Sequence, residues 1–174
     1  MARDTLTQTA WIEAGLRQLA SVGPNALRAE PLARHLKTTK GSFYWHFKDV
    51  PAFQSALLEY WQTDALAKLA ALDEVTGTAA ERVIALGQSI QSDAADPALR
   101  AWSQSEPSVL NVVGAVDTAR MTKLSALMTE MGNDNPDFTK AAYGSLVGLR
   151  QMQMDDGEAL IAFAALVDLV LSLN

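Results

Sequence analysis

The chain has 174 residues, of which 49% are apolar, 20% charged and 7% aromatic, and its formal net charge is −6. This composition is that of a globular protein and excludes a disordered chain. Without cysteine the chain can form no disulfide, thiolate metal site or cysteine nucleophile, and two histidines exclude a three-histidine zinc site. Its start lacks the apolar segment of a secretory signal, and its most apolar stretch, residues 159–173, is shorter than the roughly 20 residues that span a bilayer. We expect a soluble, cytoplasmic protein that does not bind to a membrane and needs no cofactor or metal.

Charge is distributed unevenly along the chain. Residues 1–48 carry 7 basic and 3 acidic side chains, a net charge of +4, whereas residues 49–174 carry 7 basic and 17 acidic ones, a net charge of −10. A small basic segment on a larger acidic one is typical of a nucleic-acid-binding domain attached to a separate functional domain. Chance segregation of surface charge is the alternative. We predict a DNA-binding domain over residues 1–48 and a helical regulatory and dimerisation domain over residues 49–174.

Apolar residues recur at helical spacing along the whole chain, and proline and glycine separate the helical segments. Gly23 and Pro24 end the first segment, Thr38 and Thr39 precede the third, and Asp49 precedes a long fourth one. No alternating strand pattern exceeds a few residues. The sequence therefore predicts an all-α protein of about nine helices, over residues 7–21, 28–36, 39–45, 49–72, 78–94, 96–102, 106–132, 136–154 and 157–172.

The first three predicted helices have the lengths and short turn of a helix-turn-helix unit. Such a unit presents a reading helix to the major groove, holds it on a small apolar core and places cations against phosphates. We expect Leu16, Leu19, Leu32, Leu36 and Phe43 to form the core. Tyr44 and Trp45 are neighbours, so at least one is exposed; His46 suits either a phosphate contact or a structural role at the helix end. The candidate DNA-binding residues are Arg28, Thr38, Thr39, Lys40, Ser42, Tyr44, Trp45, His46 and Lys48.

Residues 32–49, with the sequence LARHLKTTKGSFYWHFKD, resemble the DNA-binding motif of the tetracycline-repressor (TetR) family. The resemblance implies a bacterial transcriptional regulator, most often a repressor that binds a palindromic operator as a homodimer and is released by a small molecule. Two positions depart from the family pattern: Lys37 replaces a turn glycine, and Leu27-Arg28 replaces a threonine pair. A residue with a side chain at positive φ costs roughly 1 kcal/mol or more, so either Lys37 is strained or the turn has another shape.

The same resemblance implies a small apolar or amphipathic effector in the acidic domain, whose binding tilts the fourth helix and respaces two DNA-binding heads. Each candidate lining residue could equally be ordinary core or surface. These candidates are Trp61, Gln88, Gln91, Trp102, Met121, Tyr143 and Gln151.

The last two predicted helices have the composition of a dimer interface. The final one is apolar on nearly every face, and the preceding one carries small residues at three- and four-residue steps, so two copies could form a four-helix bundle. Burial within one subunit is the alternative. Asp168 would need a partner there, with Arg150 one candidate. The candidate interface residues are Ala141, Gly144, Ser145, Gly148, Phe163, Leu166, Val167 and Val170.

Other classes of function have little support in the sequence. It contains no nucleophile elbow with a Ser/His/Asp set, no phosphate-binding loop and no HExxH motif, and the acidic loop at 133–137 lacks the glycine and closing glutamate of a calcium loop. We therefore expect no enzyme. The competing hypothesis is a helical adaptor whose basic segment binds a protein and has no affinity for DNA.

Overall fold

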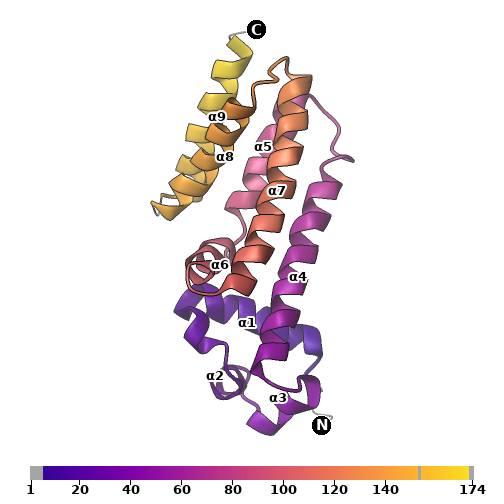
Figure 1. Ribbon diagram of the computed structural model, residues 1–174, viewed down its shortest axis with the longest axis vertical. Coiled ribbons are helices and arrows are strands. Elements are labelled where there is room, and N and C mark those ends of the chain that lie inside the picture. The colour runs from indigo at the N-terminus through magenta and orange to yellow at the C-terminus, as the bar shows by residue number, and fades with distance from the viewer. Residues whose placement is uncertain (1–5, 153, 173–174) are drawn as a thin grey trace. The chain divides into compact units, whose positions relative to one another are not determined.

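The computed structural model describes residues 6–152 and 154–172, and over these residues the chain is helical with no strand (Figure 1). The predicted all-α class is confirmed. Most predicted boundaries agree within about two residues, although the fifth and eighth helices end three residues early. The elements are α1 (Gln8–Val22), the 3₁₀ turn η1 (Pro24–Ala26), α2 (Ala29–His35), α3 (Lys40–His46), α4 (Val50–Ala71), α5 (Ala79–Gln91), α6 (Asp96–Ser103), α7 (Pro107–Glu130), α8 (Pro136–Gln151) and α9 (Asp156–Ser172).

Side-chain caps fix where several helices begin. The Thr7 hydroxyl accepts from the backbone N–H of Ala10 ahead of α1, and the Asp49 carboxylate accepts from that of Ala52 ahead of α4. Before α5, the backbone N–H and the hydroxyl of Thr78 donate to the Glu81 carboxylate, and these bonds hold the pKa of Glu81 below its usual value. The caps therefore satisfy N–H groups that have no acceptor inside the helix.

The chain forms two compact units, and α4 and α7 each run from one into the other. Unit 1 holds the described residues up to Thr63 together with Ala94–Val113, and unit 2 holds Asp64–Asp93 and the described residues from Gly114 onward. Helix α6 thus belongs to the same compact unit as α1, α2 and α3. The domain boundary predicted after residue 48 concerns DNA binding rather than compactness, and it stays a prediction.

Unit 1 is built on a close approach of α1 and the start of α4. A Cβ atom on Gly15 would lie 2.6 Å from Cζ of Phe53 and 2.7 Å from Cδ1 of Leu57, so only glycine lets these helices meet without displacement. Of the expected core residues, Leu19, Leu32 and Phe43 are buried, whereas Leu16 and Leu36 are only partly covered. Within α1, Ala14 is buried in this core, whereas Ala20 is exposed.

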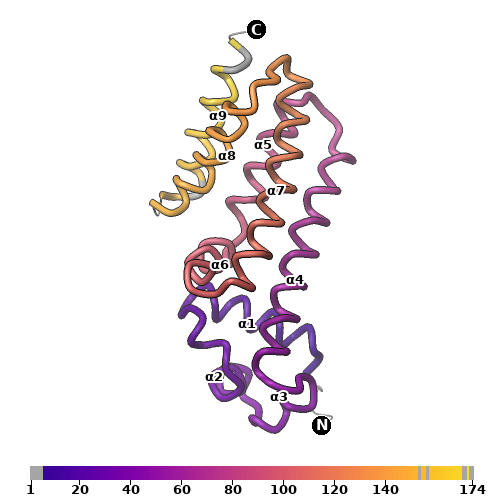
Figure 2. Tube along the Cα trace, in the orientation of Figure 1, coloured from indigo at the N-terminus to yellow at the C-terminus, as the bar shows by residue number. Residues whose placement is uncertain are grey.

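Unit 2 has a separate apolar core, in which α9 lies against α5 and α8 (Figure 2). Phe163 of α9 is fully buried there, and a Cβ on Gly87 of α5 would lie only 3.0 Å from its ring. Yet Ile161 and Leu169 on the same helix are 72% and 50% exposed. Helix α9 is therefore not buried on all sides within a single chain, which goes against the alternative of burial within one subunit and leaves the dimer interface a prediction.

No helix in the described part of the chain combines the length and the apolarity needed to cross a membrane.

Candidate nucleic-acid interface and effector region

Helices α2 and α3 pack against each other and are joined by a four-residue turn over residues 36–39 (Figure 1). Arg28 lies at the N-cap of α2 and makes no side-chain capping bond. A threonine hydroxyl at this position could accept one, and the chain lacks the threonine pair of the family pattern here. In the turn, Lys37 has φ +53°, so of the two possibilities raised by the sequence the strained backbone is the one observed. The Thr39 hydroxyl then accepts from the N–H of Ser42 at 3.2 Å and starts α3.

An aromatic cluster, formed by Trp11, Phe43, Phe47 and Phe53, fixes α3 to the rest of unit 1. Phe43 has no exposed surface, and its ring centroid lies 5.5 Å from that of Trp11, 5.2 Å from Phe47 and 5.3 Å from Phe53. Most of these pairs are edge-to-face, an arrangement that adds to the stabilisation from burial alone. Phe43 therefore joins α3 to α1 and α4, and the sequence identified only Phe43 of these four as core of the helix-turn-helix unit.

The opposite face of α3 is exposed. Trp45 is 90% exposed and Tyr44 is 48% exposed, whereas the sequence required only that one of them be so. The ammonium of Lys40 lies 6.0 Å from the centre of the Tyr44 ring. None of the nine candidate DNA-binding residues is buried: Arg28, Thr39, Lys40, Tyr44, Trp45 and Lys48 are exposed, and Thr38, Ser42 and His46 are partly exposed.

Positive charge around α3 is not neutralised by the protein itself. Arg28, Lys40 and Lys48 make no ion pair among the described residues, whereas Arg34 on the neighbouring helix pairs with Glu30 at 3.1 Å. An exposed aromatic helix flanked by unpaired cations can bind a polyanion through its charges and a groove through its aromatic side chains.

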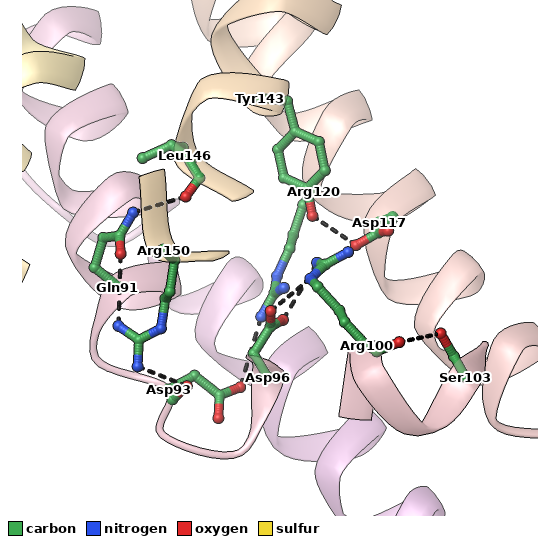
Figure 3. A network of polar contacts seen from close by, with 10 residues as sticks. All are labelled: Gln91, Asp93, Asp96, Arg100, Ser103, Asp117, Arg120, Tyr143, Leu146 and Arg150. Atoms are coloured by element: carbon green, nitrogen blue, oxygen red, sulfur yellow. Dashed lines mark hydrogen bonds and ion pairs between the residues drawn. The ribbon is translucent and has the colours of Figure 1, made fainter. Parts of the chain in front are cut away.

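Unit 2 contains a polar cluster among apolar helices, formed by the buried Gln91 and Arg120 and the partly buried Asp93 and Arg150 (Figure 3). Gln91 is 2% exposed, and its amide N–H donates to the carbonyl of Leu146 at 2.9 Å. The guanidinium of Arg150 donates to the carbonyl of Asp93 at 3.2 Å and lies 3.5 Å from Oε1 of Gln91. The guanidinium of Arg120, which is 4% exposed, lies 3.7 Å from the Asp93 carboxylate. The cluster thus connects the end of α5 to α7 and α8.

A second polar contact lies in the same unit, between α8 and α7. The hydroxyl of Tyr143 donates to the Asp117 carboxylate at 2.6 Å (Figure 3). In unit 1, by comparison, Arg100 of α6 pairs with Asp96 one turn earlier, with Nε to Oδ2 at 2.6 Å. Because charged groups are costly to bury, such contacts mark the polar part of an interior.

The candidate effector residues separate into four groups. Gln91 and Tyr143 belong to the polar contacts of unit 2, whereas Trp61 and Trp102 are buried in unit 1. Met121 is partly buried, and the remaining two, Gln88 and Gln151, are exposed.

Sequence reasoning missed the charged members of the polar cluster. A signal was present, because Arg120 stands four residues from both Val116 and Leu124 and so interrupts the apolar stripe of α7. The proposed pairing of Arg150 with Asp168 is wrong. Arg150 contacts the end of α5 instead, and Asp168 lies on the exposed face of α9.

The candidate dimer residues all belong to unit 2, some on its surface and some in its core. Ala141 and Gly144 of α8 are exposed, and Ser145, Gly148 and Leu166 are partly exposed. Phe163 and Val167 are instead buried in the core of their own chain against α5 and α8, so they offer no free surface to a partner. The side chain of Val170 lies outside the described part of the structure.

Residues 12–49 match the sequence model of the family described as bacterial regulatory proteins, tetR family. The chain matches no curated protein sequence. Among solved structures it resembles a protein from Rhodococcus sp. described as a TetR-family transcriptional regulator, at 18% identity with a TM-score of 0.76, over 94% of this chain and 98% of that one.

Two other similar structures contain ligands. One is a transcriptional regulator from Saccharomonospora viridis in complex with choline, at 12% identity, with a TM-score of 0.80 over 92% of this chain and 95% of that one. The other is the transcriptional regulator FadR from Bacillus subtilis in complex with stearoyl-CoA, at 13% identity, with a TM-score of 0.66 over 95% and 98%. At these identities the likeness concerns the fold.

The helix order, the helix-turn-helix geometry and the matching N-terminal sequence define the fold of a helix-turn-helix transcriptional regulator. Residues 12–49 thus match the tetR family of bacterial regulatory proteins, and the chain as a whole shares the fold of solved structures described as TetR-family regulators. In the described residues, no group of three or more His, Asp or Glu side chains could hold a metal ion.

We expect Phe43→Ala to lower the free energy of unfolding by about 3–5 kcal/mol, because it empties the centre of the aromatic cluster. The adjacent Tyr44→Ala, on the exposed face, should change it by less than about 0.5 kcal/mol. Urea denaturation followed by circular dichroism measures both. Equal effects of the two substitutions would show that α3 is not held through Phe43.

Proposed function

We propose that this protein is a ligand-responsive repressor that binds a palindromic operator as a homodimer and is released by a small molecule. The observation that carries the proposal is the outward presentation of Tyr44 and Trp45 by a helix whose other side is fixed through Phe43. Residues 1–48 are the DNA-binding domain in this proposal, and the remaining chain regulates and dimerises. The regulator acts in the cytoplasm, and the proposal assigns it no catalytic role.

Recognition of DNA divides between the two kinds of exposed side chain. Helix α3 enters the major groove, where Tyr44 and Trp45 contact base edges and thymine methyl groups. Arg28, Lys40 and Lys48 neutralise phosphates, which supplies affinity independent of sequence. Thr38, Thr39 and Ser42 donate hydroxyl hydrogen bonds to the backbone, and His46 reaches a phosphate from the end of α3.

Dimerisation is supported by the surface of unit 2. The exposed side of α8 carries Ala141 and Gly144, and a Cβ on Gly144 would meet no atom within 4 Å, so a second backbone can approach. The exposed side of α9 carries Ile161 and Leu169, which are costly to leave in water. Two copies of α8 and α9 then form a four-helix bundle about a two-fold axis, and the symmetry places two α3 helices on successive half-sites about 34–36 Å apart.

The effector is proposed to bind in unit 2 and to carry a polar group. The structural relatives with choline and with stearoyl-CoA each hold a ligand that has a charged part. In this chain the guanidinium groups of Arg120 and Arg150 form the polar feature that an anionic group, such as the phosphates of stearoyl-CoA, could contact. The effector binds one conformation of the protein more tightly than the other, and the resulting shift in population tilts α4. The tilt moves the two DNA-binding domains out of register with the major grooves.

Removing a phosphate-binding cation and removing a groove-binding side chain should have different salt signatures. Lys40→Ala should reduce the slope of log affinity against log salt by about 0.9 for each phosphate that is no longer neutralised, because fewer counterions are released. Trp45→Ala should weaken specific binding by about tenfold while leaving that slope unchanged, because the indole carries no charge. Fluorescence anisotropy with an operator selected from genomic DNA measures both effects.

The control for this series is Lys140→Ala, an exposed lysine of α8 that should leave DNA binding unchanged. If the unaltered protein does not bind DNA even at low salt, the repressor proposal fails. The alternative, a helical adaptor that binds a protein through its basic segment, would then be favoured by partner binding that survives Lys40→Ala and Tyr44→Ala.

Gly144→Leu should weaken the dimer at least about tenfold, because a bulky side chain would separate the two α8 helices. Gly114→Leu is the matched control, since that glycine is also exposed on a helix and also has no atom within 4 Å of its Cβ position. Sedimentation equilibrium measures the dimer dissociation constant. An unchanged constant for Gly144→Leu would place the interface elsewhere.

An effector bound near the cluster should stabilise the folded protein by about 2.7 kcal/mol at 100 times its dissociation constant. We expect the corresponding rise in Tm, with the anionic stearoyl-CoA as the first probe, to shrink in Arg150→Met. Arg82→Met is the matched control, because Arg82 is an arginine of the same unit that pairs with Glu130 and lies outside the cluster. A ligand that stabilises both variants equally binds elsewhere.

A further inference from the structure

Lys37 is the one residue other than glycine with a positive φ in the described part of the chain. At the three other positive-φ positions, residues 23, 77 and 132, the chain has glycine, which adopts this conformation without strain. A side chain at such a position crowds the backbone and raises the energy of the folded state. The turn between α2 and α3 would therefore fold more favourably with glycine than with lysine.

No contact of the Lys37 side chain with another described residue offsets this strain. The side chain is exposed, and no described residue forms an ion pair or a side-chain hydrogen bond with it. Among the described residues, Lys37 is held by a hydrogen bond from its backbone N–H to the carbonyl of Arg34 at 3.2 Å, which any residue except proline could make. Backbone strain that no contact of the strained residue offsets is characteristic of functional positions.

The positive charge of Lys37 further raises the energy of the folded protein when no DNA is bound. Lys37 stands in the turn directly before Thr38, Thr39 and Lys40, and it adds a cation to a surface that already has unpaired Lys40 and Lys48. Like charges on one surface repel each other, but the same field attracts a polyanion.

Resting on the proposed DNA-binding function, we propose that Lys37 is a further phosphate-binding residue, placed by the turn that leads into α3. The lysine ammonium on its flexible stem neutralises a phosphate of the strand beside which α3 enters the groove. The contact gives affinity without sequence preference, and the strain is retained because glycine at this position could not make it.

Three substitutions at residue 37 separate charge from backbone strain. Lys37→Arg keeps both, Lys37→Ala removes the charge and keeps the Cβ, and Lys37→Gly removes both. Each is measured by fluorescence anisotropy on the operator across a salt series, and by thermal denaturation without DNA. Lys140→Ala is again the control for a lysine of the other unit.

We expect Lys37→Arg to bind DNA like the unaltered protein. Lys37→Ala and Lys37→Gly should both bind about threefold more weakly or worse, and their salt slopes should fall by about 0.9, the change that corresponds to one phosphate left without its cation. Only Lys37→Gly should raise Tm, by about 2–4 °C, because it alone relieves the left-handed backbone.

Unchanged affinity and salt slope in Lys37→Ala, with normal binding by the unaltered protein, would overturn the role of Lys37 and leave the repressor proposal intact. Absence of salt-dependent DNA binding by the unaltered protein would instead overturn both. An unchanged Tm for Lys37→Gly would show that the positive φ of residue 37 does not destabilise the folded protein.

Discussion

The burial of Phe43 is the interaction on which the rest of unit 1 depends. Helix α3 has only seven residues, and a helix so short is not stable by itself in water. Contacts of the Phe43 ring with Trp11 and Phe53 attach it to α1 and α4. Because one face of so short a helix is used for this attachment, Tyr44 and Trp45 must lie on the exposed side. The surface proposed to read DNA is thus a consequence of core packing.

Several features near α3 are unfavourable for folding alone. Gly41 weakens the helix by about 1 kcal/mol relative to alanine, and a Cβ there would meet only the Thr39 hydroxyl, at 3.7 Å. Trp45 leaves a large apolar surface in water, and Lys37 holds a strained backbone. Departures from local rules that occur together are expected where a protein is selected for binding as well as for stability.

Unit 2 combines an apolar core with charges that are expensive to bury. Arg120 lies within the apolar stripe of α7, and Arg150 connects α8 to the end of α5. An entirely apolar interior would serve stability at least as well, since buried ion pairs contribute little net free energy. The proposed effector site gives these groups a use beyond stability.

The sequence by itself determined the helical class, most helix ends, the helix-turn-helix motif and the burial of Phe43, because periodicity and capping are local properties of the chain. Only the tertiary structure decided which helix covers which face. It directs Phe163 inward and leaves Ile161 in solvent, and it brings Arg150 to Asp93 rather than to Asp168. The spacing of apolar residues along a helix shows that it must pack against other elements. Which elements these are depends on packing between segments far apart in the sequence.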